Sequence, residues 1–571
     1  MRNSEIAQIL NEIADILELQ GVQFKPRAYR KAARTIENLT DELTELATHE
    51  ELEALPGVGT RIAEKIRELL ETGDLTYLHK LRKEIPQGWV ELLQVPEIGP
   101  KTVQRLSKEL DINSIVDLQK AIEDHKIREL EGFGEKSEEN LREAISFFEE
   151  HTKRTFIGKA YPLVQNLLHH LKGISEVKRV EVAGSFRRWR ETVGDIDILV
   201  ASSNPLPVMN RFVNLSGVER VLAKGDTKSS IILKEGIQVD IRVVPPAAFG
   251  AAFLYFTGSK GHNITLRRVA QKRGWKLNEY GLFDNRTGEV IARKTEEEIY
   301  KALGMEWIPP ELREDSGEIE AAQKGKIPQL ITLEDIRGDL QIHTTWSDGA
   351  ASIEVMVKAA QHRNYEYIAI SDHSQAVTIA GGLKEKELSK QIAEIRKLDD
   401  KIKDIHILAS AEVEILADGS LDFSDNILSQ LDVVSIGLHY GTKKPSEEIT
   451  DRLISAMKNK YVDILVHPTG RIVNQRLGYN VDLDRLIEAS KKYHVYLEIN
   501  GSDRHDLTAV AARRVKEHGL KMVINTDAHR SIQLDFMRYG VAIARRAWLQ
   551  ADDIINTRKF SDFRRLLKHI H

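Results

Sequence analysis

The sequence has no cysteine, and this absence limits the kinds of site that the chain can form. Without thiols there are no disulfides and no thiolate ligands, so a bound metal must be held by histidine, aspartate or glutamate. The chain supplies these in quantity, with 19 histidines and 87 acidic residues. Candidate metal sites are therefore sought among histidine and carboxylate side chains.

Long hydrophobic runs are also missing. No apolar stretch approaches the roughly 20 residues that span a bilayer, and residues 1–20 form an amphipathic acidic pattern without the apolar core of a signal peptide. We therefore expect a cytoplasmic protein with no membrane partner. At 571 residues, of which 41% are hydrophobic, the chain has the size of roughly four globular domains.

The formal net charge of -5 argues weakly against a nucleic-acid partner, but this number averages over segregated charges. Between Lys25 and Arg34 there are five basic residues and no acidic one. A basic patch can therefore exist on a mildly acidic protein. A solvated helix face explains the same run equally well.

The most informative stretch is Gly184-Ser185, followed about ten residues later by Asp195 and Asp197. Side chains alternate along an extended strand, so the two aspartates share one face while Ile196 takes the other. Two carboxylates on one face repel each other unless a cation lies between them, and Mg²⁺ prefers such oxygen ligands. The stretch predicts metal-assisted nucleotidyl transfer, with the glycine-serine turn gripping phosphate.

A third acid completes this pattern. Residues 237–243 alternate in the same way and leave Asp240 on the polar face. Together with residues 229–233 and the turn-like 234–236, this run predicts a hairpin that could set Asp240 beside the first two acids. Three acids can hold two divalent ions, one activating the attacking hydroxyl and one steadying the nucleotide phosphates. An Asp-x-Asp pair alone is more often a solvated edge strand, but the turn and Asp240 together favour the catalytic interpretation.

Three short glycine turns occur in the first 150 residues, spaced by roughly 35 to 40 residues. They lie at 55–60, with Gly57 and Gly59, at 95–100, with Gly99, and at 130–135, with Gly132 and Gly134. Backbone N–H groups at the start of a helix can hold a phosphate. The repetition is typical of helix-hairpin-helix units that grip the DNA backbone without reading its sequence. A helical bundle with glycine connectors is the alternative.

From about residue 335 the pattern changes to short apolar runs that end in a metal-ligand residue type. The runs lie at 339–343, 367–373, 407–412, 433–439, 462–467 and 522–529. Helical patterns separate them, which is the layout of a β/α barrel with its chemistry at the C-terminal ends of the strands. One such histidine is more often structural than a ligand. Five histidines at equivalent strand ends, with Glu412 and Asp527, predict a metal centre.

Residues 1 to about 315 resemble the family X DNA polymerases, the group that includes DNA polymerase beta. Residues 24–33 and 57–66 look like that family's 5′-phosphate-binding and deoxyribose-phosphate lyase domain. Lys65 matches the Schiff-base lysine, whose pKa the neighbouring cations Arg61 and Lys25 would lower. A helix lysine without a chemical role is the alternative for the lyase activity. The DNA-binding residues that the resemblance implies are Lys25, Tyr29, Gly57, Gly59, Arg61, Gly99, Gly132, Gly134, Arg242 and Arg267.

In the polymerase centre, the resemblance implies that Ser185 and Arg188 contact the phosphates of the incoming nucleotide. Trp189 departs from the family, which often has glycine there. Residues 255–259 are similar to the turn that selects the nucleotide sugar, where Gly258 allows a close approach. The implied nucleotide-binding residues are Gly184, Ser185, Arg188, Gly194, Tyr255, Phe256, Gly258 and Asn263, and the implied catalytic metal ligands are Asp195, Asp197 and Asp240. Without the resemblance, Tyr255 and Phe256 would be interpreted as core aromatics.

Residues 335–571 resemble the polymerase and histidinol phosphatase (PHP) domain. The ligands that this implies, for up to three ions, are His343, Asp348, His373, Glu412, His439, His467, Asp527 and His529. Gln341 stands where the family usually has histidine, and an amide is a poorer ligand, so one metal site should be weaker or emptier. Mixed imidazole and carboxylate ligation suits Mn²⁺ or Zn²⁺, with a bound hydroxide attacking a phosphoester.

The combined order of domains resembles bacterial family X DNA polymerases over nearly the whole chain. It implies a DNA-directed DNA polymerase that uses Mg²⁺ or Mn²⁺ and fills short gaps in base excision repair, with a 3′–5′ exonuclease, and incision at abasic sites as a further activity of the PHP domain. The expected partners are gapped or nicked DNA and dNTPs, and the expected form is a monomer that works at the nucleoid. Alternatives are a phosphatase of the histidinol phosphate type with an inactive polymerase module, and a non-enzymatic DNA-binding scaffold.

The predicted fold is multidomain, α+β and α/β. It combines a helix-hairpin-helix N-terminal region, a nucleotidyltransferase palm with a mixed sheet, and a distorted β/α barrel. The predicted domains are 1–80 (lyase-like), 81–150 (helix-hairpin-helix fingers), 151–245 (palm), 246–315 (nucleotide-selecting subdomain), 316–334 (linker) and 335–571 (PHP).

Overall fold

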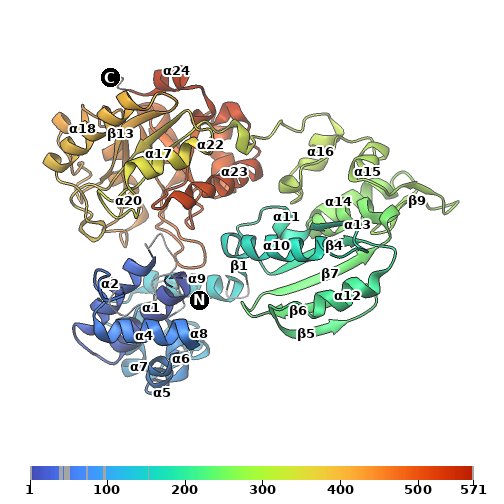
Figure 1. The fold of residues 1–571 in the computed structure, drawn as a ribbon, viewed down its shortest axis with the longest axis horizontal. Helices are drawn as coiled ribbons and strands as arrows, with labels where there is room; N and C mark the ends of the chain where they lie inside the picture. Colours follow the sequence, from blue (N-terminus) through green and yellow to red (C-terminus); the bar gives the residue numbers. More distant parts are fainter. Residues whose placement is uncertain are drawn as a thin grey trace.

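The computed structural model describes residues 3–37, 43, 52–72, 75–93, 95, 98–151 and 154–568. Figure 1 shows three lobes, a helical one from the N-terminal third, one around a mixed sheet and one around a parallel sheet. None of the helices in this part of the chain has both the length and the apolar character of a membrane-spanning segment. The predicted multidomain architecture is confirmed.

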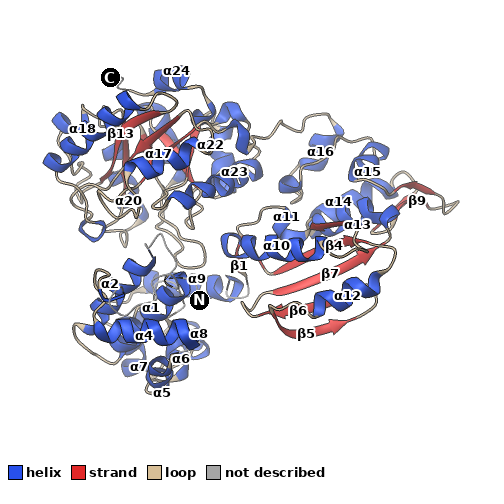
Figure 2. Ribbon diagram, in the orientation of Figure 1, coloured by secondary structure: helices blue, strands red, loops and turns tan. Residues whose placement is uncertain are grey.

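The described part of the N-terminal lobe is built from helices (Figure 2). They pack around one hydrophobic core. Its helices are α1 (Asn3–Leu19), α2 (Lys25–Glu37), α4 (Thr60–Thr72), α5 (Thr76–Lys83), α6 (Gln87–Leu92), α7 (Pro100–Leu110), α8 (Ile115–Glu123) and α9 (Glu135–His151). In α1, Ile6, Leu10 and Ile13 recur every three or four positions, so they share one buried face. The glycine turns lie directly before α4, α7 and α9. Pro96 and Glu97 of the second turn lie outside the described residues.

The middle lobe begins with a five-stranded sheet in the order β2-β4-β7-β6-β5. Its elements are β1 (Thr155–Phe156), α10 (Ile157–Lys172), β2 (Arg179–Val182), α11 (Gly184–Arg187), β3 (Thr192–Val193), β4 (Asp195–Ala201), α12 (Pro205–Val213), β5 (Val218–Lys224), β6 (Lys228–Leu233) and β7 (Gln238–Val244). The predicted hairpin is present as β6 and β7, which pair antiparallel. Helices α10 and α12 cover the face that carries Ile196 and Ile198. The acidic face of β4 is therefore left for chemistry.

A second part of this lobe has its own core. Its elements are α13 (Phe249–Thr257), α14 (Lys260–Gln271), β8 (Trp275–Asn278), β9 (Gly281–Asp284), β10 (Val290–Ala292), α15 (Glu296–Ala302) and α16 (Glu318–Gln323). Residues 316–334, expected as a linker because they contain few hydrophobic residues, include α16. Ile319 and Ala322 of α16 are buried in that core, and the Glu318 carboxylate lies 2.6 Å from Nδ1 of the buried His262.

The C-terminal lobe is a nearly closed barrel of seven parallel strands. They are β11 (Gly338–Ile342), β12 (Tyr367–Ile370), β13 (His406–Glu414), β14 (Val433–Gly437), β15 (Ile464–Leu465), β16 (Tyr496–Asn500) and β17 (Met522–Asn525). A bridge between Ile342 and Ala528 joins the first strand to the end of the last. The helices are α17 (Ile353–Gln361), α18 (Glu385–Lys401), α19 (Asp425–Leu428), α20 (Ser446–Met457), α21 (Leu483–Tyr493), α22 (Ala509–Glu517), α23 (Met537–Arg546) and α24 (Phe560–Phe563).

Six of the seven strands were expected from the sequence, and β16 was not. Its sequence, Tyr-Leu-Glu-Ile-Asn, ends in asparagine and carries no histidine, so a search for apolar runs that end in a typical metal ligand does not find it. The strand is buried along most of its length, as expected for a parallel sheet covered by helices.

Candidate active sites

The three predicted catalytic acids lie on neighbouring strands. Strands β4 and β7 pair in parallel, and Asp197 stands directly opposite Asp240 in the register. Side chains at paired positions project from the same face, and Asp195, two residues before Asp197, shares that face. The structure therefore places all three carboxylates on one face of the sheet, although they come from positions up to 45 residues apart in sequence (195 to 240).

The carboxylates repel one another in the absence of a cation. Burial and the charges of Asp195 and Asp240 raise the pKa of Asp197 to about 7. Lys228 lies 3.4 Å from Asp240 Oδ2 and is exposed for half of its side-chain surface, so it screens only part of this charge. A cluster of hard oxygen donors with uncompensated charge fits a divalent cation such as Mg²⁺.

The glycine-serine turn approaches these acids closely. Gly184 begins α11 with a φ of +60°, and a Cβ built there would lie 3.1 Å from the carboxyl carbon of Asp197 and collide with its Oδ2. Only glycine leaves room for both the backbone conformation and the neighbouring carboxylate.

Replacing Gly184 with alanine should lower the rate of nucleotide incorporation by about a hundredfold or more, because displacing a carboxylate by about 1 Å costs on this order. Single-nucleotide extension of a labelled primer measures the rate. Gly236→Ala is the matched control, since Gly236 also has a positive φ (+78°) but has no atom within 4 Å of the added Cβ. Equal losses in both variants would assign the effect to backbone strain and contradict the role of the close approach.

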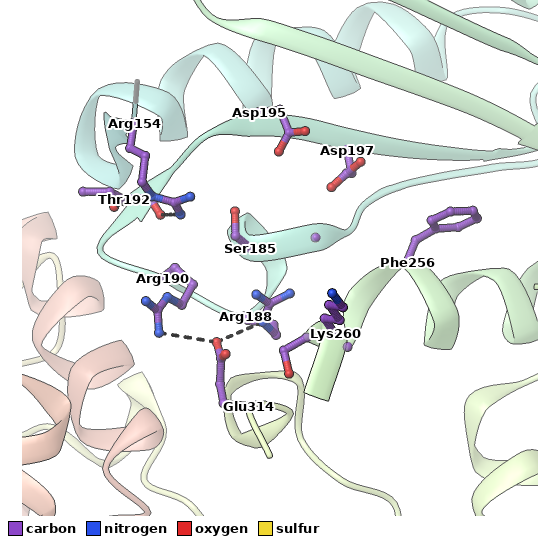
Figure 3. A pocket seen from close by; sticks show the side chains of 13 residues that line it. Arg154, Ser185, Arg188, Arg190, Thr192, Asp195, Asp197, Phe256, Lys260 and Glu314 are labelled. Carbon is purple, nitrogen blue, oxygen red and sulfur yellow. Dashed lines mark hydrogen bonds and ion pairs between the residues drawn. The ribbon is translucent and has the colours of Figure 1, made fainter. Parts of the chain in front are cut away.

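A cavity of about 690 Å³ opens beside the acids, and Figure 3 shows the side chains that line it. Ser185 and Arg188, the residues predicted to contact the nucleotide phosphates, line it, and so do Arg190 and Glu314. Arg188 donates from Nε to Glu314 Oε1 (2.9 Å) and from Nη1 to the carbonyl oxygen of Thr257 (2.7 Å). The lining is rich in cations and suits a polyphosphate.

Arg187, the other arginine of the motif, has a different environment. It pairs with both carboxylate oxygens of Glu296, at 2.7 and 2.8 Å, and its guanidinium lies over the ring of Phe253. The fully buried Arg313 pairs with the same carboxylate at 2.6 and 3.0 Å. This network joins the two parts of the middle lobe, so that of the two adjacent arginines only Arg188 lines the cavity.

The predicted nucleotide-selecting turn lies at the end of α13, next to this cavity. Phe256 and Gly258 line the cavity, and a Cβ at Gly258 would lie 2.6 Å from Asn263 Oδ1. The Asn263 amide donates to the carbonyl oxygens of Tyr255 (2.7 Å) and Gly258 (3.1 Å), which fixes the turn. Both aromatic side chains are half-buried, and Arg242 lies over the Phe256 ring.

Three further residues that the sequence singled out lie in and near this site. Arg267 donates to the carbonyl oxygen of Asn263 (3.2 Å). Gly194 precedes β4, and a Cβ there would lie 3.3 Å from Arg154. Trp189, the departure from the family pattern, has a φ of +53° and packs beside Tyr161.

In the N-terminal lobe, Lys65 lies on α4 with Nζ 4.6 Å from the centre of the Tyr77 ring. Burial lowers the pKa of Lys65, and the charges of Arg61 and Lys25 lower it further, whereas Glu64 and Glu68 oppose the shift. The pKa of Lys65 is therefore lowered, as expected, but burial is the largest cause of the shift. The glycine turn precedes α4, and Gly57 has a φ of +85°. Tyr29 is buried and interacts with Tyr77.

The other predicted glycines have varied geometry. Gly59 leaves open space around a built Cβ, and Gly99 is the N-cap of α7 with an extended backbone. Gly132 has a φ of +78°, which favours glycine, and Gly134 directly precedes α9. Each second glycine thus exposes the N–H groups of a helix start, the geometry that holds phosphate.

In the barrel, the predicted metal ligands converge at one end of the strands. Three groups of side chains have ligand atoms within 4.8 Å of one another, and these are His343 with Asp348, His373 and His529; His373 with Glu412 and His439; and His343 with Glu412 and Asp527. His467 joins them, with Nε2 2.8 Å from Glu412 Oε1. All eight predicted ligands therefore lie in one cluster, and Glu412 belongs to two of its three groups.

This cluster fits bound metal ions. Within this cluster, buried ring nitrogens that make no hydrogen bond occur at His343, His373, His439 and His467, so these imidazoles have free ligand positions. Burial alone would raise the pKa of Glu412, but the surrounding imidazoles hold this pKa well below its usual value. Glu414 accepts from Nδ1 of His439 at 2.7 Å and orients that ring, a common arrangement around metal-binding histidines.

Gln341, the departure from the PHP pattern, is buried and faces the same cluster. Its amide donates to Glu412 Oε2 (3.0 Å), and Asn500 lies 3.5 Å from its carbonyl oxygen. The Gln341 amide therefore orients the predicted ligand Glu412, whereas a histidine at this position would itself be a metal ligand.

Sequence reasoning missed several polar residues around the barrel site. Glu498 and Asn500 on β16 lie behind it, and the Asn500 amide donates to Glu498 and to Asp527. Arg504 donates to Asp527 Oδ2 at 3.2 Å. Burial and the charge of Asp527 raise the pKa of Glu498 well above its usual value. The alternating pattern of β16 was the available signal, but its polar residues are not typical strand-end ligands.

Comparison with known families assigns most of the chain. Residues 1–75 match a helix-hairpin-helix domain, and residues 90–146 match a SAM-like helix-hairpin-helix tandem. Residues 252–314 match the DNA polymerase beta thumb, and residues 339–502 match the PHP domain.

Individual relatives extend this comparison. DNA polymerase/3′-5′ exonuclease PolX of Bacillus subtilis is 38% identical over 572 residues, which cover the full length of both chains. DNA polymerase lambda of Rattus norvegicus is 24% identical over 55% of this chain and 56% of its own. A probable phosphatase of Thermoanaerobacter sp. is 29% identical over 38% of this chain and 89% of its own. The full-length similarity to the Bacillus protein, together with the thumb and PHP matches, shows that the chain belongs to the family X DNA polymerases that carry a C-terminal PHP domain.

Proposed function

We propose that this chain is a DNA-directed DNA polymerase with a 3′–5′ exonuclease in its barrel, and that it fills short gaps during DNA repair. The observation that carries the proposal is the set of three acids in register on β4 and β7, beside a cavity lined by Ser185 and Arg188. The full-length relative that is named as a polymerase and exonuclease supports it.

In the polymerase site, Asp195, Asp197 and Asp240 would hold Mg²⁺ or Mn²⁺, which lowers the pKa of the attacking hydroxyl and neutralises the phosphates. Ser185 and Arg188 would bind the triphosphate. Arg188 must then exchange Glu314 for a phosphate oxygen. Because the protein contributes mainly position and charge to phosphoryl transfer, this set is sufficient for the chemistry.

In the barrel, the eight-residue cluster would hold Mn²⁺ or Zn²⁺, up to three ions, and supply hydroxide for attack on the terminal phosphodiester. Since Gln341 donates to Glu412 instead of offering an imidazole, we propose that one ion is held more weakly than the others. Incision at abasic sites would use the same hydrolytic chemistry.

The proposal can be tested on a gapped duplex labelled at the 5′ end of the primer and incubated with Mn²⁺. We expect extension to the end of the gap with dNTPs, shortening of the primer without them, and neither reaction with EDTA. A protein that does neither under any of these conditions would overturn the proposal.

We propose that gap recognition uses the 5′-phosphate on the downstream strand, which Lys25, Tyr29 and Arg61 would bind together with the first glycine turn. Removing this phosphate from a one-nucleotide gap should then slow extension by the parent about tenfold, the scale of one or two lost charge-assisted hydrogen bonds. Lys25→Ala and Arg61→Ala should extend both substrates equally slowly. Lys80→Ala, an exposed lysine on α5, is the control and should keep the parent's preference.

We propose that Lys65 forms a Schiff base with a 5′-deoxyribose phosphate, supported by its lowered pKa. Borohydride should trap the parent on such DNA, and Lys65→Ala should lose the cross-link. An undiminished cross-link in Lys65→Ala would assign the activity to another amine.

A phosphatase of the histidinol phosphate type is the second candidate, because the barrel matches a probable phosphatase over 89% of that phosphatase's length. It would hydrolyse histidinol phosphate or p-nitrophenyl phosphate faster than a DNA 3′ end. We favour DNA as the substrate because the relative that spans the whole chain is named as a polymerase.

We further propose that the predicted domain boundaries near residues 150, 245 and 335 hold, that the protein acts as a monomer, and that it works at the nucleoid. The separate hydrophobic cores of the N-terminal lobe, the two parts of the middle lobe and the barrel support these boundaries, whereas residues on both sides of the predicted 80/81 boundary share one core. Sedimentation with and without gapped DNA tests the monomer.

A further inference from the structure

One loop of the barrel lobe contacts the polymerase motif directly. Arg471, in the loop between β15 and α21, donates to both carboxylate oxygens of Glu191, from Nη2 at 2.8 Å and from Nη1 at 3.4 Å. The two side chains are only 16% and 21% exposed. Glu191 lies between Arg190 and Thr192, both of which line the polymerase cavity.

The same loop makes a second contact with the cavity wall. The Asn474 amide donates to the backbone carbonyl oxygen of Arg154 at 2.9 Å. The Arg154 side chain in turn donates to Thr192, at 3.0 Å to Oγ1 and 2.6 Å to the carbonyl oxygen, and lines the cavity. One barrel loop thus holds two neighbouring segments of the polymerase lobe.

Aromatic packing extends this interface. Tyr539 of α23 packs against Trp189 and Tyr161, with ring centres 6.2 Å apart in each pair. Trp189 directly follows Arg188, so the residue that departs from the family pattern contacts the barrel lobe.

We propose that the barrel loop at 468–479, with Tyr539, positions the nucleotide-binding turn of the polymerase site, and that Arg471 and Asn474 are positioning residues for nucleotide incorporation. The proposal rests on the polymerase function proposed above. Among the described residues, the contacts of these side chains do not include the three acids, so their effect should fall on nucleotide affinity. A partly buried ion pair is well suited to fix a register between two lobes, because either charge left alone loses its compensation.

The test is steady-state extension of a gapped primer. We expect Arg471→Ala, Asn474→Ala and Glu191→Gln each to raise the KM for dNTP roughly fivefold, in the range of coupling between contacting residues, with kcat and the Kd for gapped DNA within about twofold of the parent. The double variant Arg471→Ala with Glu191→Gln should be no worse than its worse single variant, because both remove one interaction. Arg485→Ala, which removes an exposed pair with Asp451 in the same lobe, is the matched control and should change nothing.

A KM within twofold of the parent in both Arg471→Ala and Asn474→Ala would overturn the proposal. So would additive effects in the double variant. A variant that merely unfolds would show a lower kcat and a lower melting temperature without a higher KM. Arg471→Lys retains the charge but not the bidentate pair, so it should give an intermediate KM. If the parent protein itself incorporates no dNTP, the polymerase function is refuted. That result differs from a failure of the positioning proposal, in which the parent and the variants incorporate dNTP with the same KM.

Discussion

Replacing Glu412 with glutamine should reduce the 3′–5′ degradation of DNA by about a thousandfold or more, while primer extension stays within about twofold of the parent. Glu412 belongs to two of the three candidate metal groups, and its oxygens lie 2.8 Å from His467, 3.1 Å from His439 and 3.3 Å from His343. An amide of the same shape removes the negative charge that would bind metal ions in this cluster and that attracts the surrounding imidazoles. Loss of one metal-bound nucleophile is worth several kcal/mol, and about 4 kcal/mol corresponds to a thousandfold.

The measurement is the shortening of a 5′-labelled single strand with Mn²⁺, followed over time. Glu448→Gln, at an exposed position on α20, is the control and should degrade DNA as the parent does. Because Glu412 is fully buried, the melting temperature and the extension rate report whether the variant is folded. Degradation at the parent rate by a folded Glu412→Gln protein would place the nuclease elsewhere.

Asp195→Asn should have the opposite pattern, with extension reduced by about a thousandfold or more and degradation unchanged. Asp195, Asp197 and Asp240 share one face of the sheet. Of the described carboxylates, Asp195, Asp197 and Glu314 line the cavity beside β4, and Glu314 is engaged by Arg188. Removing one of the three proposed ligands would weaken the binding of the ions that are proposed to activate the hydroxyl and to neutralise the phosphates, a loss of about 4 kcal/mol or more.

Single-turnover extension of a gapped duplex at saturating dNTP measures this effect. Asp226→Asn, in an exposed loop of the same lobe, should extend at the parent rate. The change also removes like charge next to Asp197, so the fold should be no less stable. Normal extension by Asp195→Asn would remove this carboxylate from the proposed site. Loss of both activities in either variant would instead mean that the two sites are not independent.

Much of both sites could be predicted from local sequence patterns. Strand alternation put Asp195, Asp197 and Asp240 on polar faces, and the predicted hairpin of β6 and β7 was found. In the barrel, ligands at strand ends were predicted to meet, and parallel strands bring their C-terminal ends to one edge. The strand β16 was missed because its polar residues, Glu498 and Asn500, are not typical ligands at a strand end.

Other features depended on long-range contacts. Arg187 and Arg188 are adjacent and chemically identical, yet one pairs with Glu296 and the other faces the cavity. The lowered pKa of Lys65 was expected from neighbouring cations, whereas burial is the larger cause. The stretch expected as a linker contains α16, whose Ile319 and Ala322 are buried and whose Glu318 lies 2.6 Å from the buried His262.

The sequence by itself determined which residue types could do chemistry and which strand faces they occupied, because periodicity and side-chain chemistry are local properties. Only the tertiary structure decided that Gln341 donates to Glu412, that Glu314 engages Arg188, and that Arg471 reaches Glu191 from 280 residues away. The reason is physical. Such pairings follow from how separately folded lobes pack, and no local pattern encodes the partner of a charge that lies in another lobe.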